Sequence, residues 1–252
     1  HERIGEVKIT KPYKLCEVRP AFGKVFKEWL EGYDFWAFGD CDVILGNLRG
    51  TFTDEFLDKY EWFQVLGNLQ IIRNTEEVNN YYLLERPKGS ELKHFTWQSV
   101  IREENNTAFD EWNGCPWLIR ENGKRIFWTR ENFVNIYQED KGYKKMIDNT
   151  VQHNTLFQYW LWKNGSIYHV DRLTGRKKEW LYIHFSSRKM KTIPYKGQKK
   201  VYITANSEFK ESIKWKDTWC GLDFWKAYFR KGRAYISWHL SHWMKKTVKK
   251  QA

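Results

Sequence analysis

The sequence contains little that would suggest a secreted, membrane-spanning or repetitive protein. Its four cysteines are far apart and form no CxxC pair, so neither a zinc site made by cysteines alone nor a disulfide framework is indicated. No stretch approaches the ~20 apolar residues needed to span a bilayer. The first residues are polar and unlike a signal peptide, and no internal repeat or low-complexity linker is present. We therefore expect a cytoplasmic protein with reduced cysteines.

Charged and aromatic residues, by contrast, are abundant. Of the 252 residues, 29% are charged and 18% are aromatic, and the formal net charge is +12. This is the composition of a globular protein, long enough for one large domain or a domain with an appendage. The positive charge predicts an anionic partner, such as a nucleic acid, an acidic lipid or a phosphorylated substrate. Charge alone does not choose among these three.

Helical and strand patterns alternate in the first part of the chain, which favours an α/β fold. Helices are predicted over residues 20–30, 53–60 and 75–84, the last two capped by Thr53 and Thr75, and strands over residues 33–38 and 63–73. The aromatic segment 33–38 is typical of a buried strand in a parallel sheet. Residues 127–182 favour shorter strands, with a hairpin turn at Asn164 and Gly165.

The tail of the chain has a different character. We expect a domain over residues 1–208 and a basic, Trp-rich helical extension over residues 209–252, which ends in MKKTVKK. One interpretation is contact with a membrane surface, because Trp with Lys suits the lipid interface. The other is an aromatic helical lid that packs on the domain and keeps its lysines in solvent.

The strongest local motif follows the first predicted strand. Asp40 and Asp42 are two residues apart where the strand ends, and such carboxylates can jointly hold a hard divalent cation. Mg²⁺ and Mn²⁺ prefer oxygen ligands and keep positions open for substrate phosphates. Open α/β sheets also place ligands where strands end. In isolation, however, Asp-x-Asp usually marks a polar turn.

Several sequence blocks in order resemble a family of GT-A glycosyltransferases from bacterial capsule and O-antigen gene clusters. The first is KPYKLCEVRPAFGKVFKEWLEGYDFWAFGDCDVILGNLR at residues 11–49, and FDEW at 109–112, YIHF at 182–185 and RKMK at 188–191 follow. Glu17 stands where the family has Asp, and Arg19 where it usually has Lys. The resemblance covers about residues 10 to 205. The family's N-terminal region, with its first strand and much of its nucleotide-base pocket, has no counterpart in this sequence.

The resemblance implies a GT-A-like, Rossmann-like mixed sheet flanked by helices. It also implies transfer of a sugar from a nucleotide-sugar donor to a saccharide or lipid-linked saccharide acceptor, in surface polysaccharide synthesis. The implied cofactor is Mn²⁺ or Mg²⁺, bound by Asp40, Asp42 and His184. Such an enzyme would act in the cytoplasm or peripherally on the inner face of the cell membrane. An alternative for His184 is a strand histidine that hydrogen-bonds to the backbone.

Further roles follow from the same resemblance. Asp110 and Glu111 are the candidate catalytic carboxylates, one of which would accept the proton of the acceptor hydroxyl. Donor-binding roles are implied for Lys14, Arg19, Asp40, Arg188, Lys189 and Lys191, because cations suit a diphosphate. The alternatives are an N-cap at Asp110 for a helix beginning at Glu111, surface ion pairs of Lys14 and Arg19 with Glu17, and a solvated basic loop at 188–191.

Other functions fit parts of the sequence. Positive charge with interleaved aromatics suits single-stranded nucleic acid, although we recognise no binding module and expect no nucleic-acid partner. Carboxylates with His and Lys also serve metal-dependent phosphodiesterases, although those sites normally use more carboxylates than this sequence brings together. A non-catalytic protein that keeps the fold without the donor pocket is a third interpretation.

Overall fold

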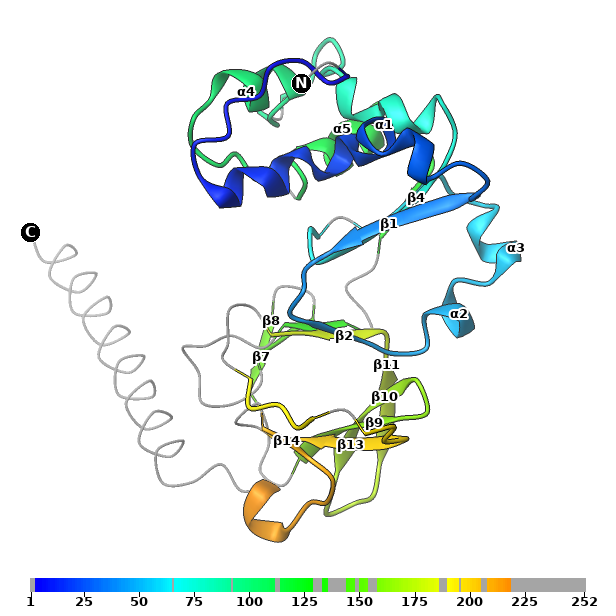
Figure 1. The fold of residues 1–252 in the computed structure, drawn as a ribbon, viewed down its shortest axis with the longest axis vertical. Helices are drawn as coiled ribbons and strands as arrows, with labels where there is room; N and C mark the ends of the chain where they lie inside the picture. The colour runs from blue at the N-terminus through cyan, green and yellow to red at the C-terminus, as the bar shows by residue number, and fades with distance from the viewer. Residues whose placement is uncertain are drawn as a thin grey trace, which may run out of the picture. The chain divides into compact units, whose positions relative to one another are not determined.

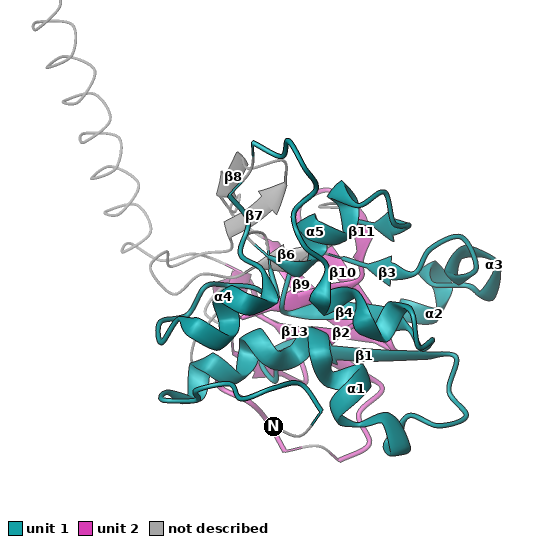
Figure 2. Ribbon diagram, turned by 90° about the horizontal axis from the view of Figure 1, so that it is seen from above, with its two compact units in different colours: residues 1–43, 48–130 teal, residues 44–47, 131–252 magenta. Residues whose placement is uncertain are grey.

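The computed structural model describes residues 3–218 apart from gaps at 65, 92, 112–113, 129–132, 136–143, 148–149, 154–157, 186–189, 195 and 205–207. The fold is mixed α/β (Figure 1). The chain forms two compact units, coloured separately in Figure 2: residues 1–43 with 48–130, and residues 44–47 with 131–252. Each unit has its own sheet structure and its own hydrophobic core.

The first unit is built on a four-stranded sheet with the strand order β1-β4-β3-β5. Its strands are β1 (Phe35–Gly39), β3 (Trp62–Phe63), β4 (Leu69–Arg73) and β5 (Ile126–Phe127). β4 runs antiparallel to both β1 and β3, and β3 runs parallel to β5. The strand predicted at 33–38 is confirmed, but its expected parallel pairing is wrong. Trp36 and Phe38 are buried while Ala37 between them is exposed, and such alternation is typical of antiparallel strands.

Short helices complete the first unit. These are η1 (Pro12–Ala21), α1 (Phe22–Val25), η2 (Lys27–Trp29), α2 (Leu48–Thr51), α3 (Asp54–Leu57), η3 (Val78–Leu83), α4 (Trp97–Arg102) and α5 (Cys115–Glu121), where η denotes a 3₁₀ helix. The helix predicted from Pro20 begins eight residues earlier, at Pro12, whose fixed φ suits a first helical position. Thr53 caps α3 as predicted, because its side chain accepts a hydrogen bond from the Phe56 N–H at 3.3 Å.

The core of the first unit lies between the sheet and its helices. Figure 1 shows α1, α4 and α5 on one side of β1 and β4. Trp36 and Ile72 from the sheet share this core with Trp97 and Leu118 from α4 and α5. The buried Trp36 indole donates to Asn79 Oδ1 at 2.9 Å, so its polar atom has a partner. This packing fixes the position of β1, the strand that leads to Asp40.

The second unit is mostly strands. Its five-stranded sheet has the order β11-β10-β9-β13-β14, formed by β9 (Gln158–Lys163), β10 (Ser166–Asp171), β11 (Lys177–Trp180), β13 (Lys200–Ile203) and β14 (Phe209–Lys210). A three-stranded sheet has the order β2-β12-β6, formed by β2 (Val43–Leu45), β12 (Tyr182–His184) and β6 (Phe133–Asn135), and β7 (Lys144–Ile147) pairs with β8 (Thr150–His153). The predicted hairpin turn is confirmed: Asn164 and Gly165 join β9 to β10 with φ values of 49° and 83°.

The end of the described chain continues the five-stranded sheet. β14 pairs with β13, and a short helix, η4 (Trp215–Thr218), follows. The rest of the predicted helical extension, from residue 219 onward, lies outside the described residues, so that extension stays a prediction. Within the part of the chain that the structure describes, none of the helices has the length and apolarity needed to cross a membrane.

Candidate functional site

The end of β1 places Asp40 against the loop that precedes β4. The Asp40 N–H donates to the Asn68 carbonyl at 3.3 Å. A Cβ on the preceding Gly39 would lie 2.8 Å from that carbonyl oxygen, so only glycine allows the two backbones to approach this closely. The sequence Gly-Asp therefore fixes where the first carboxylate of the Asp-x-Asp motif lies.

Arg19 connects Asp40 with Asp110. Its Nη1 donates to Asp40 Oδ1 at 2.7 Å, while its Nε and Nη2 donate to Asp110 Oδ2 at 3.1 and 2.5 Å. The guanidinium also lies 5.3 Å from the centre of the Phe38 ring. A planar guanidinium can hold two carboxylates at a fixed spacing, which a lysine ammonium does less well. The structure thus brings together three residues that the sequence had singled out, at positions 19, 40 and 110.

Asp110 is anchored from a second side. Gln70, in β4, donates from Nε2 to the Asp110 carbonyl at 2.6 Å and accepts a hydrogen bond from the Trp62 indole at 2.7 Å. Asp110 lies in a turn and is only 2% exposed. It does not cap a helix beginning at Glu111, because the next helix, α5, begins at Cys115. That alternative interpretation of Asp110 is therefore wrong.

Burial raises the pKa of Asp110 to about 7, because the nearby Arg19 charge only partly offsets the loss of water and the Glu111 charge adds to the rise. Glu111 is the more exposed of the two acids. Gly67 lies against all three charged groups: a Cβ there would be 2.6 Å from Asp110 Oδ2, 2.7 Å from Arg19 Nη2 and 2.9 Å from Glu111 Oε1. Position 67 therefore has room only for glycine, because any larger residue would collide with these three side chains.

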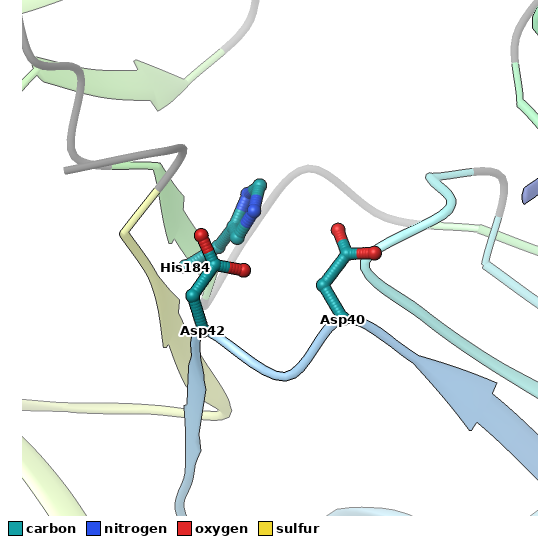
Figure 3. Close-up of side chains that lie close together, drawn as sticks. All are labelled: Asp40, Asp42 and His184. Carbon is teal, nitrogen blue, oxygen red and sulfur yellow. The ribbon is translucent and has the colours of Figure 1, made fainter. Parts of the chain in front are cut away.

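A group suited to a metal ion includes the same Asp40. Asp40, Asp42 and His184 each offer a ligand atom, and these atoms lie within 4.8 Å of one another (Figure 3). Asp42 directly precedes β2, and His184 ends β12, the strand beside β2 in the three-stranded sheet. All three side chains are half-buried. Two carboxylates and one imidazole are a suitable ligand set for Mn²⁺ and an acceptable one for Mg²⁺.

Lys14 lies elsewhere, inside the first unit. It forms an ion pair with Glu17 and donates to the Asn105 carbonyl at 3.3 Å, and Glu17 accepts from the Thr107 backbone and hydroxyl. The ion pair with Glu17 was one of the interpretations of the sequence, but its expected place on the surface is wrong, because both side chains are almost completely buried. Arg19, the other residue in that interpretation, pairs with Asp40 and Asp110 instead of Glu17.

The remaining basic candidates are placed only in part. Lys191 is exposed and forms an ion pair with Glu208 at 2.7 Å. Arg188 and Lys189 lie outside the described residues. Their predicted roles in donor binding stay predictions.

Sequence reasoning missed the residues that support the cluster, namely Trp62, Gly67 and Gln70. The available signal was a set of polar residues inside an apolar segment, since FQVLGNLQIIR at 63–73 places Gln and Asn among aliphatic side chains. Buried polar groups need partners, so such residues indicate a hydrogen-bonded network. Gln70, fully buried and bonded on both sides, is one of these.

Comparisons with known proteins identify the family of this chain. Neither the curated proteins nor the solved structures contain a match to this chain. A family of unknown function, DUF6625, matches residues 2–212, which include both aspartates, Arg19, Asp110 and His184. The match extends over most of the sequence, so the chain belongs to the DUF6625 family.

Proposed function

We propose that this chain is a metal-dependent glycosyltransferase that moves a sugar from a nucleotide-sugar donor to a saccharide or lipid-linked saccharide acceptor. The observation that carries the proposal is the group formed by Asp40, Asp42 and His184, with ligand atoms within 4.8 Å. By itself this group supports only a divalent cation site. The step to sugar transfer rests on the ordered sequence blocks that resemble GT-A glycosyltransferases, which include all three of these residues.

The residues of this group would hold Mn²⁺ or Mg²⁺. The ion would supply positive charge for the diphosphate that leaves when the glycosidic bond forms. Arg19 already binds Asp40 through Nη1, so it fixes the orientation of that carboxylate and keeps a second positive charge beside it. In this proposal the guanidinium contributes to binding the donor's phosphates, as its planar donors suit them.

The acceptor hydroxyl must lose a proton during transfer, and a carboxylate near the site can accept it. Of the two candidates, we assign this role to Glu111, because its side chain is partly exposed. Asp110 is buried and bound by two nitrogens of Arg19, so we assign it to positioning Arg19. In this proposal the protein works in the cytoplasm or peripherally on the inner face of the cell membrane.

The rival functions have less support. Among the described residues, the candidate metal-binding group contains two carboxylates and one histidine, whereas two-metal phosphodiesterases normally require more carboxylates. For a nucleic-acid-binding protein, the half-buried carboxylates of Asp40 and Asp42 would repel phosphates in the absence of a metal ion.

Thermal unfolding tests the proposal. A ligand that binds only the folded protein raises the unfolding temperature, and a ligand at about 100 times its Kd adds about 2.7 kcal/mol. We expect one nucleoside diphosphate or nucleotide sugar to stabilise the protein in the presence of Mn²⁺ and not in its absence. Asp42→Ala should abolish this shift while leaving the unfolding temperature of the unliganded protein nearly unchanged.

The matched control is Glu55→Ala, which removes a carboxylate that is 86% exposed and lies outside the metal group. It should keep the full metal-dependent shift. If Asp42→Ala keeps the shift as well, the metal assignment is wrong. If no nucleotide stabilises the wild-type protein with either Mn²⁺ or Mg²⁺, this chain by itself does not bind a nucleotide donor, and the proposed transferase function does not hold for it.

A further inference from the structure

The first unit contains a hollow that the proposed metal site does not use. It has a volume of about 740 Å³, and its walls come from the start of β1, the end of β4 and the two short helices α2 and α3. Figure 1 places α2 and α3 next to each other in the chain segment that follows β2. Ligand pockets in proteins typically range from about 300 to 1,000 Å³, so the hollow has the size of a small-molecule site.

The floor of the hollow is apolar and firmly packed. Phe52 and Leu57 are only 3% and 7% exposed, and Phe52 contacts Phe63 edge to face with ring centres 5.6 Å apart. Phe35 lies beneath the Arg73 guanidinium at 4.6 Å. Arg73 also donates to the Leu57 carbonyl at 2.9 Å, so its position is fixed from two sides. A ligand would therefore meet a preformed surface.

The rim of the hollow is polar and rich in carboxylates. Arg73 pairs with Asp58 at 3.3 Å, Arg49 pairs with Asp54 at 3.0 Å, and Asp34 adds a third carboxylate. Three acids and two guanidiniums give this rim a formal charge of −1, in a protein whose overall charge is +12. Such a rim attracts anions less than the basic remainder of the protein does, so it suits a neutral ligand better than a diphosphate or an acidic lipid headgroup.

We propose that this hollow binds a neutral saccharide. Sugar hydroxyls both donate and accept hydrogen bonds, so they match a rim that alternates carboxylates with guanidiniums. The apolar faces of sugar rings match aromatic side chains, and Tyr33, which is 65% exposed, lies at the hollow with its ring accessible. A mixed apolar and polar lining of this kind suits a polyhydroxylated ligand better than a purely hydrophobic one.

The position of the hollow indicates which part of an acceptor it would hold. Tyr33 to Phe35 are at the start of β1, whereas Asp40 follows the end of the same strand. Five residues of extended chain span roughly 17 Å. The hollow is therefore too far from Asp40 for the reacting sugar, and it would hold a remote unit of an oligosaccharide. This inference rests on the proposed function for its choice of the acceptor as ligand.

Saccharide binding can be measured by saturation-transfer difference NMR with maltotriose, cellotriose and chitotriose at millimolar concentrations, without metal or nucleotide. We expect saturable binding of at least one trisaccharide to the wild-type protein. Asp34→Ala should weaken it about tenfold, because the ligand would lose a hydrogen bond to a charged group. Tyr33→Ala should weaken it similarly, and Tyr33→Phe should not.

The matched control is Trp29→Ala, which removes an aromatic side chain that is 82% exposed and lies outside the hollow. It should leave the affinity unchanged. Asp42→Ala should also leave it unchanged, so that failure of the transferase proposal and failure of the saccharide site are separate results. Absence of saturable binding to the wild-type protein would overturn the inference. It would also be overturned if Asp34→Ala and Tyr33→Ala both bound the trisaccharide as tightly as the wild-type protein does.

Discussion

At the scale of single residues, the Arg19 guanidinium links two acids of the candidate site. It binds Asp40, a proposed metal ligand, and Asp110, a buried acid, through separate nitrogens. Buried charges are stable only when they are paired and hydrogen-bonded. Asp110 is nevertheless near its titration point, since its pKa is about 7, so its protonation couples the stability of the cluster to pH.

We predict that Asp110→Asn changes the pH dependence of stability. The folded-state pKa of Asp110 is raised from its ordinary value of 3.8 to about 7, so the folded protein binds more protons than the unfolded chain between these values. The contribution of Asp110 to stability is therefore greatest below pH ~4 and is lost as the pH rises to ~7. Urea unfolding from pH 4.5 to 7.5 should show the wild-type protein losing stability relative to Asp110→Asn.

The pKa of Glu61 is shifted in the opposite direction to that of Asp110. Burial raises its pKa, but hydrogen bonds from Arg125 and Tyr81 outweigh burial and lower the pKa below the ordinary value of 4.5. Its contribution is present above pH ~4.5 and is lost as the pH falls. Glu61→Gln should therefore flatten the loss of stability in acid.

The opposite result for Asp110 would contradict the direction of its pKa shift. If the wild-type protein gains stability relative to Asp110→Asn as the pH rises, Arg19 lowers the pKa of Asp110 and burial does not raise it.

The sequence predicted the acids and Arg19 of the site but not the contacts among them. Asp40 and Asp42 could be recognised because the motif is local and follows a strand. The pairing of Arg19 with Asp110 could not, because 91 residues separate them and no periodicity relates them. Gly67 has no distinctive sequence context, and its importance is visible only once three charged groups surround it.

At the scale of secondary-structure elements, the predictions that rested on local sequence signals were reliable, and the prediction of strand pairing was not. The Thr53 cap and the Asn164-Gly165 turn depend on residues within three or four positions, and both are confirmed. The pairing of β1 depends on its partner β4, because paired residues such as Phe35 and Arg73 or Gly39 and Leu69 lie far apart in the chain. An aromatic-rich strand suits a parallel or an antiparallel neighbour, so composition could not decide the pairing.

The β9–β10 turn allows a test of this local signal. Gly165 has a φ of +83°, and a Cβ there would meet no atom within 4 Å. Gly165→Ala should therefore act through backbone conformation alone and lower the free energy of unfolding by about 1 kcal/mol. Gly165→Asn should cost less, because Asn tolerates positive φ better than Ala does. Equal losses for the two variants in urea unfolding would show that φ is not the cause.

At the scale of the whole molecule, the net charge of +12 creates attraction for any polyanion, whatever the true ligand is. A weak interaction with DNA or RNA would therefore not identify a function. The charge is also unevenly distributed, since acids gather at positions 40, 42 and 110 and around the hollow in the first unit. The way in which binding responds to salt separates general attraction from binding at a defined site.

We predict that single-stranded oligonucleotides bind weakly and are released as salt rises from about 50 to 200 mM, because their affinity comes from displaced counterions. Mn²⁺-dependent stabilisation by a nucleoside diphosphate should change far less over the same range, because few charges are involved and the half-buried ligands at positions 40, 42 and 184 are poorly screened. Fluorescence anisotropy with a labelled oligonucleotide, beside thermal unfolding with the diphosphate, measures both. Oligonucleotide binding that resists salt, together with a diphosphate effect that disappears, would favour a nucleic-acid-binding function over sugar transfer.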